Sequence, residues 1–372
     1  MSKAAELAKW GEVSTNGQVS GRRNIVINGG MNVAQRSASV ADIGAANGYF
    51  TCDRWRINTA SSAGRLTMTQ TADAPNGVSA NCLKLDCTTA DTSIAAGEYL
   101  SIQQKFEGQD LQNIGKGIAG AKEITVSFYV KANAAFTFGV ELVDADNGRQ
   151  ITKLFNTTTG WVRHELTFPA DVDDGSSPFD DDNASSLNLS FWLHAGTTYT
   201  GGTLNTAAWA DTTNANRAAG IDSFYSSTDN NFFITGVQME VGSVATPFEH
   251  RSFGEELALC QRYYTVVADG VYSDGFAPLS MGAIYNAATA YGNVSLPCDM
   301  RTFPTLEIVS GTNYYNLYRN SGVDSVDDFI LNKVGLNKIE FYNNSDVSGT
   351  AGHAVFIRTA NSAAKFALTA EL

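Results

Sequence analysis

Alternation of apolar and polar residues at every second position constrains the fold of this chain more than any other feature. Nine stretches between residues 25 and 242 show the alternation; they are rich in Val, Ile, Thr, Phe and Tyr and end at Gly, Asn, Asp or Pro. This pattern is typical of β-strands that bury one face. Many strands with almost no helical pattern between them predict two packed antiparallel sheets, and we expect a jelly-roll β-sandwich over residues 24–250.

The same alternation returns in the last hundred residues. Five or six strand-like stretches follow one another there, among them "TLEIVSG", "KIEFYNN" and "HAVFIRTA". A chain of 372 residues is long enough for two or three domains, each with its own core. We therefore predict an all-β protein with a second, smaller β-sandwich over residues 266–372.

The stretch between the two predicted sandwiches, "TPFEHRSFGEELALCQRYY" at 246–264, has helical spacing instead. Ser252 and Glu255 have the Ser-x-x-Glu spacing of a capping box, which satisfies backbone donors at a helix start. One apolar stripe follows, made of Phe253, Leu257, Cys260 and Tyr264. We predict a linker helix within 251–265, and the stripe either packs on a sandwich or forms an oligomer interface.

The first 23 residues differ from the rest. "SKAAELAKW" is typical of a short helix, and the polar, Gly-containing "GEVSTNGQVSGRRN" comes after it. A helix of about ten residues is marginally stable alone in water. We therefore expect residues 1–23 to form a docking segment that binds another protein or the body of this one.

Charge and cysteine content restrict the possible partners. The chain has 38 acidic and 25 basic residues and a formal net charge of −13, which disfavours nucleic acid and anionic membrane as ligands. No apolar run approaches 18 residues, and the first residues contain no continuous apolar stretch. Five irregularly spaced cysteines favour buried thiols over disulfides or a zinc site. We expect the chain to fold in a cytosol.

Three motifs stand out along the chain: an Asn-Gly after an Ile/Val strand, Asp-Arg-Trp at 53–55, and Gly-Val-Gln-Met-Glu-Val-Gly leading into Tyr-Tyr. The stretches that contain or accompany them are "RRNIVINGGMNVAQRS", "YFTCDRW", "VSFYVKA", "GWVRHELTFP", "FFITGVQMEVGSVATPFEHRSFGEELALCQRYY" and "LPCDMRTFPT". Over most of residues 22–305 this pattern resembles a family of tailed-bacteriophage virion proteins that is common in podoviruses of marine bacteria. The family implies a jelly-roll similar to carbohydrate-binding modules, followed by a C-terminal β-domain.

This resemblance implies a virion protein assembled in the host cytoplasm. We expect a homotrimeric tail fibre or spike, an adhesin that binds a glycan or protein of the host surface and whose residues 1–23 dock on a tail nozzle, an adaptor or the capsid. The alternative is a capsid-associated decoration or cement protein that binds other virion subunits. The four histidines lie far apart, and the sequence contains no common catalytic motif, so we expect no enzymatic activity.

Aromatic residues in two regions are candidates for receptor or sugar binding, because exposed aromatic rings stack on sugar rings. The first region is the polar loop 196–230, with Tyr199, Trp209 and Tyr225. The second is "NYYNLYR" at 313–319. If that stretch is a strand, Tyr315 and Arg319 lie on the face opposite Tyr314 and Tyr318, and we expect Tyr315 and Arg319 to be exposed. Packing beneath the loop or in a subunit interface is the alternative for these aromatic residues.

The acidic loop 169–186 is a candidate calcium site. Carboxylate oxygens are the ligands that calcium prefers, and like charges in a short loop repel one another unless a cation is present. The candidate ligands are Asp171, Asp173, Asp174, Asp180, Asp181 and Asp182. A solvated acidic loop is the alternative, and we expect no cofactor apart from this possible structural Ca²⁺.

Overall fold

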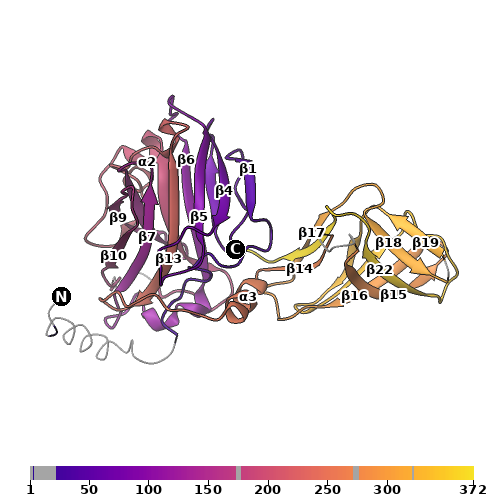
Figure 1. Cartoon of the computed structure of the whole chain (residues 1–372). Coiled ribbons are helices and arrows are strands. Elements are labelled where there is room, and N and C mark those ends of the chain that lie inside the picture. Colours follow the sequence, from indigo (N-terminus) through magenta and orange to yellow (C-terminus); the bar gives the residue numbers. More distant parts are fainter. Residues whose placement is uncertain (1–2, 4–21, 173–176, 271–275, 321) are drawn as a thin grey trace. The chain divides into compact units, whose positions relative to one another are not determined.

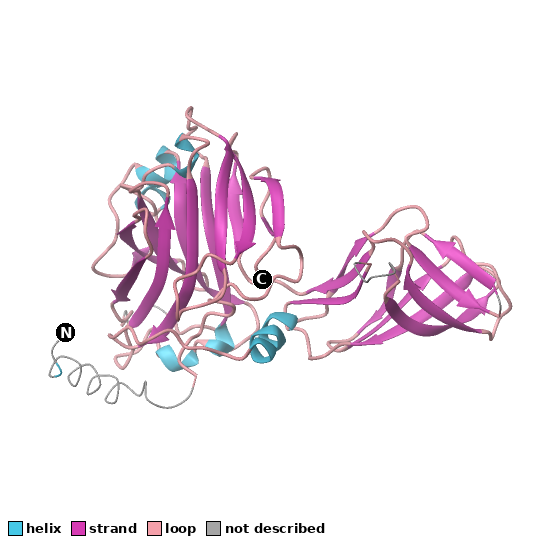
Figure 2. Ribbon diagram, viewed as in Figure 1, coloured by secondary structure: helices cyan, strands magenta, loops and turns pink. Residues whose placement is uncertain are grey.

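The computed structural model of the chain describes residues 3, 22–172, 177–270, 276–320 and 322–372. Residues 1–256 with residue 372 form one compact unit, and residues 257–371 form a second unit. Strands dominate both units, which confirms the all-β prediction (Figure 1, Figure 2). Within the described ranges, no helix combines the length and the apolar character needed to cross a membrane. Apart from Lys3, Arg22 and Arg23, the predicted docking segment lies outside the described residues.

The N-terminal unit is a sandwich of two antiparallel sheets (Figure 1). One sheet has six strands, in the order β1 (Ser39–Ile43), β4 (Arg65–Thr71), β5 (Cys82–Thr89), β13 (Asn231–Val241), β7 (Ile124–Ala132) and β10 (Val162–Phe168). The other has seven, in the order β12 (Ala210–Asp211), β9 (Arg149–Asn156), β8 (Thr137–Asp144), β11 (Ser185–Ala195), β6 (Tyr99–Glu107), β3 (Arg56–Ala60) and β2 (Gly48–Tyr49). Short helical turns in the connections are η1 (Gly108–Asp110), η2 (Gln112–Ile114), α2 (Thr197–Thr200), η3 (Asn214–Asn216) and η4 (Phe224–Ser226).

Aromatic rings from both sheets meet in the core of this sandwich. The ring of Phe128 on β7 lies 5.0 Å from that of Phe155 on β9 and 5.0 Å from that of Phe191 on β11. Both contacts are edge-to-face, the arrangement that the quadrupoles of aromatic rings favour. The alternation seen in the sequence directs these side chains inward, so the two sheets share one apolar layer.

Asn28 joins the N-terminal stretch of this unit to the Asp-Arg-Trp stretch. Its side chain is fully buried, and its φ of 56° is a left-handed conformation that Asn tolerates better than most residues. The amide nitrogen donates to the carbonyl oxygens of Val33 (2.8 Å) and Asp53 (2.9 Å), and the amide oxygen accepts from Val33 N (3.0 Å). The indole nitrogen of Trp55 donates to the Asn28 carbonyl oxygen (3.0 Å). The Asn-Gly motif and the Asp-Arg-Trp motif therefore meet at one buried amide.

The linker helix is α3 (Phe253–Gln261), and its start confirms the capping box. Ser252 N donates to a carboxylate oxygen of Glu255 (3.0 Å), and Glu255 N donates to the Ser252 hydroxyl (3.3 Å). The carboxylate of Glu256 accepts from Asn28 N (2.6 Å). The first turn of α3 is therefore bound to the N-terminal unit.

The helix is shorter than predicted, and two of the four residues predicted to form an oligomer interface do not fit that role. Tyr264 lies in a strand, β14 (Tyr264–Asp269), and its hydroxyl donates to Glu307 (3.0 Å). Cys260 and Tyr264 are both buried within the chain, so neither can face a second copy. Phe253 remains 61% exposed, and Leu257 is half-buried.

The C-terminal unit pairs a small sheet with a large one. The small sheet has the order β14, β23 (Lys365–Thr369) and β17 (Thr305–Val309). The large sheet has the order β19 (Gly322–Val326), β18 (Tyr315–Arg319), β22 (Ala354–Thr359), β15 (Pro278–Asn286), β16 (Thr289–Ser295), β21 (Lys338–Asn343) and β20 (Ile330–Val334). Phe366 and Leu368 of the small sheet share one core with Leu317 and Ile357 of the large sheet. Side chains along β22 alternate between buried and exposed, so the opposite face of the large sheet meets solvent.

We expect Asn28→Ala to lower the free energy of unfolding of the N-terminal unit by at least about 2 kcal/mol, because buried backbone groups of Val33 and Asp53 lose their partners. Denaturation followed by tryptophan fluorescence measures this unit alone, since all five tryptophans precede residue 257. Ser61→Ala is the matched control. Ser61 is exposed and has a φ of 58°, so its replacement should change the free energy by less than about 0.5 kcal/mol. Equal losses in the two variants would contradict the role of Asn28.

Candidate functional site

The loop 196–230 packs on the seven-stranded sheet of the N-terminal unit, and this location corrects two predicted binding residues. Tyr225 is fully buried and Trp209 is 8% exposed; both belong to the core. The indole nitrogen of Trp209 donates to the Pro169 carbonyl oxygen (2.8 Å). Tyr199 is half-buried, with its ring 5.2 Å from that of Tyr99. Trp209 and Tyr225 therefore offer no exposed ring to a sugar.

An ion pair beneath this loop holds it on the sheet. Arg217 donates from Nε and Nη2 to the two carboxylate oxygens of the fully buried Glu141, at 2.8 Å each. The indole nitrogen of Trp192 also donates to Glu141 (2.8 Å), and the Arg217 guanidinium group lies 5.0 Å from the Trp192 ring centre. Both carboxylate oxygens of Glu141 accept hydrogen bonds in this network, so the loop covers this part of the sheet without leaving the buried charge unpaired.

In the acidic loop, the predicted calcium ligand Asp171 pairs with cationic side chains of the protein instead. Asp171 is buried, accepts from Nε (2.8 Å) and Nη2 (3.0 Å) of Arg149, and lies 3.8 Å from Nζ of Lys116. Nζ of Lys116 lies closer to the carboxylate of Asp144 (2.5 Å), so Arg149 is the main partner of Asp171 and balances its charge within the protein. Asp173 and Asp174 lie outside the described residues.

The other three candidate ligands lie at the carboxyl end of the loop and are exposed: Asp180, Asp181 and Asp182. Asp180 N donates to Asp146 (3.1 Å), and the carboxylate of Asp182 accepts from Ala184 N (2.8 Å). A calcium ion at these residues stays a prediction.

The strongest candidate site lies on the solvent face of the large sheet in the C-terminal unit. Val323, Tyr318, Phe356 and Met281 pair successively across β19, β18, β22 and β15 and form one row, here called the apolar row. Phe356 is 59% exposed and Met281 is 65% exposed. Exposed apolar residues that adjoin one another often belong to binding surfaces, so this row is the candidate binding surface of the unit.

Arg358 fixes the aromatic ring of Tyr318. The central guanidinium carbon of Arg358 lies 3.9 Å from the ring centre of Tyr318 and 4.4 Å from that of Phe276. A cation stacked on an aromatic face is attracted by the negative potential of that face. The Tyr318 ring is therefore held in place before any ligand arrives.

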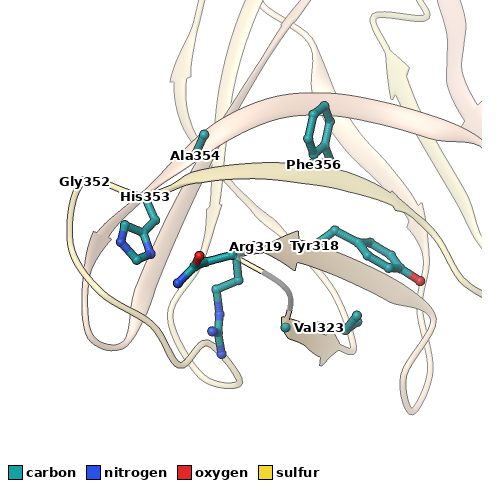
Figure 3. A pocket seen from close by; sticks show the side chains of 9 residues that line it. Tyr318, Arg319, Val323, Gly352, His353, Ala354 and Phe356 are labelled. Carbon is teal, nitrogen blue, oxygen red and sulfur yellow. The ribbon is translucent and has the colours of Figure 1, made fainter.

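Two hollows flank the Tyr318–Phe356 pair. The first has a volume of about 680 Å³ and is lined by Tyr318, Arg319, Asn320, Gly322, Val323, Gly352, His353, Ala354 and Phe356. Figure 3 shows Tyr318 and Phe356 at one end of this hollow, and Arg319 and His353 at the other. The second hollow, of about 630 Å³, shares Tyr318 and Phe356 and extends to Met281 and Arg358.

The side chain of Arg319 is fixed at the rim of the first hollow. It donates from Nε (2.8 Å) and Nη2 (2.7 Å) to Asp324, and this hydrogen bonding raises the pKa of Arg319. Burial alone raises the pKa of Asp324, but hydrogen bonds from Arg319 and Ser348 outweigh burial and hold that pKa below its ordinary value. Both groups are therefore charged near neutral pH. Arg319 is half-buried, much of its donor capacity is used within the protein, and its role in ligand binding stays a prediction.

Tyr315 lies on the opposite face from the one we predicted. It is fully buried, and its hydroxyl donates to the carbonyl oxygens of Val309 (2.8 Å) and Lys365 (2.9 Å). Tyr318, predicted on the face opposite Tyr315, lies on that opposite face and lines both hollows. Leu317 could have indicated the buried face from the sequence. It lies two positions after Tyr315, so the two side chains share a face of the strand, and an aliphatic residue favours the core.

The combination of groups around the apolar row suits a sugar. Tyr318 and Phe356 offer ring faces to the apolar side of a pyranose, and Arg319, His353 and Asn320 offer polar groups to its hydroxyls. Hollows of several hundred cubic ångströms are the usual size for small ligands. Sequence analysis missed Phe356 and Met281, because a single exposed apolar residue in a strand is unremarkable until its cross-strand neighbours are known.

Comparison with known proteins returned structural neighbours only. No family model matches the sequence, and no curated protein matches it. A structure of the enzymatically active domain of bacteriophage CBA120 tailspike protein 4 is 12% identical with a TM-score of 0.30, and the match covers 59% of this chain and 21% of that one. The chain therefore spans about a fifth of the length of that structure.

Two carbohydrate-binding modules are among the other neighbours. TmCBM61 in complex with β-1,4-galactotriose is 10% identical with a TM-score of 0.30, over 59% of this chain and 99% of that one. The CBM22-1 xylan-binding domain of Paenibacillus barcinonensis Xyn10C is 11% identical with a TM-score of 0.28, over 60% and 100%. Identities and TM-scores this low carry no argument about binding or activity.

The assignment of faces on β18 and β22 predicts that two substitutions differ in their effect on stability. Tyr315→Phe should reduce the free energy of opening of β18 and β23 by about 1–2 kcal/mol, because the partly buried carbonyl oxygens of Val309 and Lys365 lose the hydroxyl donor that they share. Phe356→Ser, at an exposed position, should change it by less than about 0.5 kcal/mol. Native-state hydrogen exchange of these strands measures both. A larger loss for Phe356→Ser than for Tyr315→Phe would reverse the assignment of faces.

Proposed function

We propose that this chain is a non-enzymatic phage virion protein, a homotrimeric tail fibre or spike whose C-terminal unit binds a glycan of the host surface. The observation that carries the proposal is the pair of rings formed by the half-buried Tyr318 and the exposed Phe356, which lie between two hollows. A placement in the virion is supported by the motifs of residues 22–305, and the docking of residues 1–23 on a tail or capsid protein belongs to the same proposal.

Binding in this proposal depends on groups that are ordered in advance. Arg358 holds the Tyr318 ring, and Asp324 and Ser348 hold the Arg319 guanidinium group. A ligand that meets an ordered site loses less free energy to side-chain ordering, so each contact is stronger. Repeated sites in an oligomer would add to this by avidity. The sugar ring stacks on Tyr318 or Phe356, and its hydroxyls bond to polar groups of the first hollow.

A decoration or cement protein is the second candidate function. Its support is the apolar character of Met281, Phe356 and Val323, which are 65%, 59% and 47% exposed and lie in neighbouring positions. A continuous apolar surface fits a protein partner as well as a sugar. In this function the apolar row contacts another virion subunit, and free sugars do not compete.

The glycan proposal predicts the effect of removing both rings. The double variant Tyr318→Ala, Phe356→Ala should bind host-cell polysaccharide at least tenfold more weakly than the unchanged chain, because stacking at the centre of the site is lost. Pull-down of the full chain on host cells and a glycan array measure binding. The same samples are assayed for sugars released by cleavage of the polysaccharide, and a non-enzymatic protein should release none.

Phe303→Ala is the matched control, since Phe303 is 66% exposed in the same unit and lines neither hollow. This variant should bind as the unchanged chain does. If the double variant keeps full binding to host cells, the glycan site is elsewhere or absent. Binding to particles that lack this protein, lost in the double variant, would support the decoration function.

The trimer proposal predicts a mass in solution about three times the 39.7 kDa of the chain. Phe253 on α3 supports it, because an exposed aromatic residue at the start of a helix can pack against copies of itself. Phe253→Asp should give a monomer by multi-angle light scattering at micromolar concentration. Ile118→Asp, at a residue 54% exposed elsewhere in the same unit, should leave the mass unchanged. A monomeric unchanged chain refutes the trimer.

A further inference from the structure

Three buried titratable side chains meet in the N-terminal unit where the chain crosses from one sheet to the other. Asp91 follows β5, Glu98 precedes β6, and His194 lies in β11, which pairs with β6. Asp91 and Glu98 are each 5% exposed, and His194 is not exposed at all. Each residue offers one metal-binding atom, and these atoms lie within 4.8 Å of one another.

Two atoms of this cluster face each other without a hydrogen bond. Nε2 of His194 lies 3.8 Å from Oε2 of Glu98, too far for a hydrogen bond. Within the part of the chain that the structure describes, neither atom has any other partner. A buried polar atom without a partner costs free energy, so a species bound between these two atoms would stabilise the folded unit.

The charges of the cluster favour a cation as that species. The cluster brings two carboxyl groups and one imidazole together. Nδ1 of the His194 ring lies 2.8 Å from the Ser223 hydroxyl. In the tautomer whose Nδ1–H donates to Ser223, the lone pair on Nε2 faces the carboxylate of Glu98. A nitrogen lone pair and a carboxylate oxygen repel each other unless a cation lies between them.

We propose that Asp91, Glu98 and His194 bind one divalent transition-metal ion, for which zinc is the best-fitting candidate. Zinc binds imidazole nitrogen and carboxylate oxygen at about 2.0–2.2 Å, so two of its ligands lie at most about 4.4 Å apart. The 3.8 Å between Nε2 and Oε2 is within this limit. An imidazole ligand distinguishes the site from the all-oxygen sites of calcium and magnesium.

Neighbouring groups already orient two of the three ligands. The carboxylate of Asp91 accepts from Ala63 N (2.9 Å), from the Ser62 hydroxyl (3.2 Å) and from Ser93 N (3.3 Å). The Ser223 hydroxyl sets the direction of the His194 ring. Outer groups of this kind are a regular feature of metal sites, because they fix the ligands before the ion binds.

The ion would join segments that are distant in the sequence. Asp91 and Glu98 lie at the two ends of the connection from β5 to β6, and Asp91 N also donates to the Tyr225 carbonyl oxygen (2.8 Å) in η4. A metal that binds all three side chains stabilises the folded unit, since the unfolded chain offers no such site. The role is structural and independent of the glycan site of the other unit.

The competing explanation is a single proton shared by the carboxyl groups of Asp91 and Glu98. Burial raises the pKa of Glu98, and the neighbouring Asp91 raises it further, which is the behaviour of such a pair. In that arrangement the protein needs no ion. The two explanations predict different responses to zinc, so one set of measurements separates them.

The test uses the full chain, freed of metal with EDTA and then dialysed. Addition of ZnCl₂ should give one bound ion per chain by calorimetric titration. It should also raise the melting temperature of the N-terminal unit, followed by tryptophan fluorescence, by roughly 5–10 °C when free zinc exceeds its dissociation constant about a hundredfold. Cobalt in place of zinc should give visible absorption bands that excess zinc removes.

Glu98→Gln and His194→Gln should each abolish the bound ion and the temperature shift. Glu98→Gln keeps the shape of the side chain, and its amide can donate to Asp91, so this variant should fold in EDTA at least as stably as the unchanged chain. His250→Gln, at an exposed histidine of the same unit, should keep the full response. The assignment is overturned if the unchanged chain shows neither equimolar zinc nor a temperature shift, or if Glu98→Gln responds as the unchanged chain does.

Discussion

The buried amide of Asn28 is the interaction on which the rest of the N-terminal unit depends. It fills the hydrogen-bonding needs of Val33 and Asp53, and the backbone of the same residue accepts from Trp55 and donates to Glu256. Stretches separated by more than two hundred residues are thereby fixed to one another. The Asn-Gly and Asp-Arg-Trp motifs therefore satisfy each other's buried polar groups: the amide of Asn28 donates to the Asp53 carbonyl oxygen, and Trp55 donates to that of Asn28.

Alternation in the sequence predicted the sheets because the period of a strand is a local property. The face that each strand buries is less local, as "NYYNLYR" shows. Its tyrosines flank Asn316 and Leu317, and only the aliphatic Leu317 identifies the core face correctly. The capping box was predictable for the same local reason. The end of the helix was not, because the β-branched run after Tyr264 starts a strand and Tyr264 belongs with that run.

Contacts between distant segments set the outcome for the candidate binding residues. An acidic loop predicts affinity for cations, yet the cations that reach Asp171 belong to Arg149 and Lys116, on elements that the loop sequence does not reveal. Similarly, a polar loop with scattered aromatic residues is typical of an exposed binding loop until Glu141 provides a buried partner for Arg217. Such pairs depend on which strands become neighbours, and the spacing of residues in one segment carries no information about that.

The thioether of Met281 gives the apolar row a chemical sensitivity that the neighbouring ring carbons lack. Met281 is 65% exposed beside Phe356, so dissolved oxidants can reach its sulfur. Conversion to the sulfoxide places a polar, chiral S=O group at one end of the apolar row without touching the core beneath. An oxidised molecule would keep its fold and its melting temperature while presenting a different surface, and a stored sample would become a mixture of two surfaces on one scaffold.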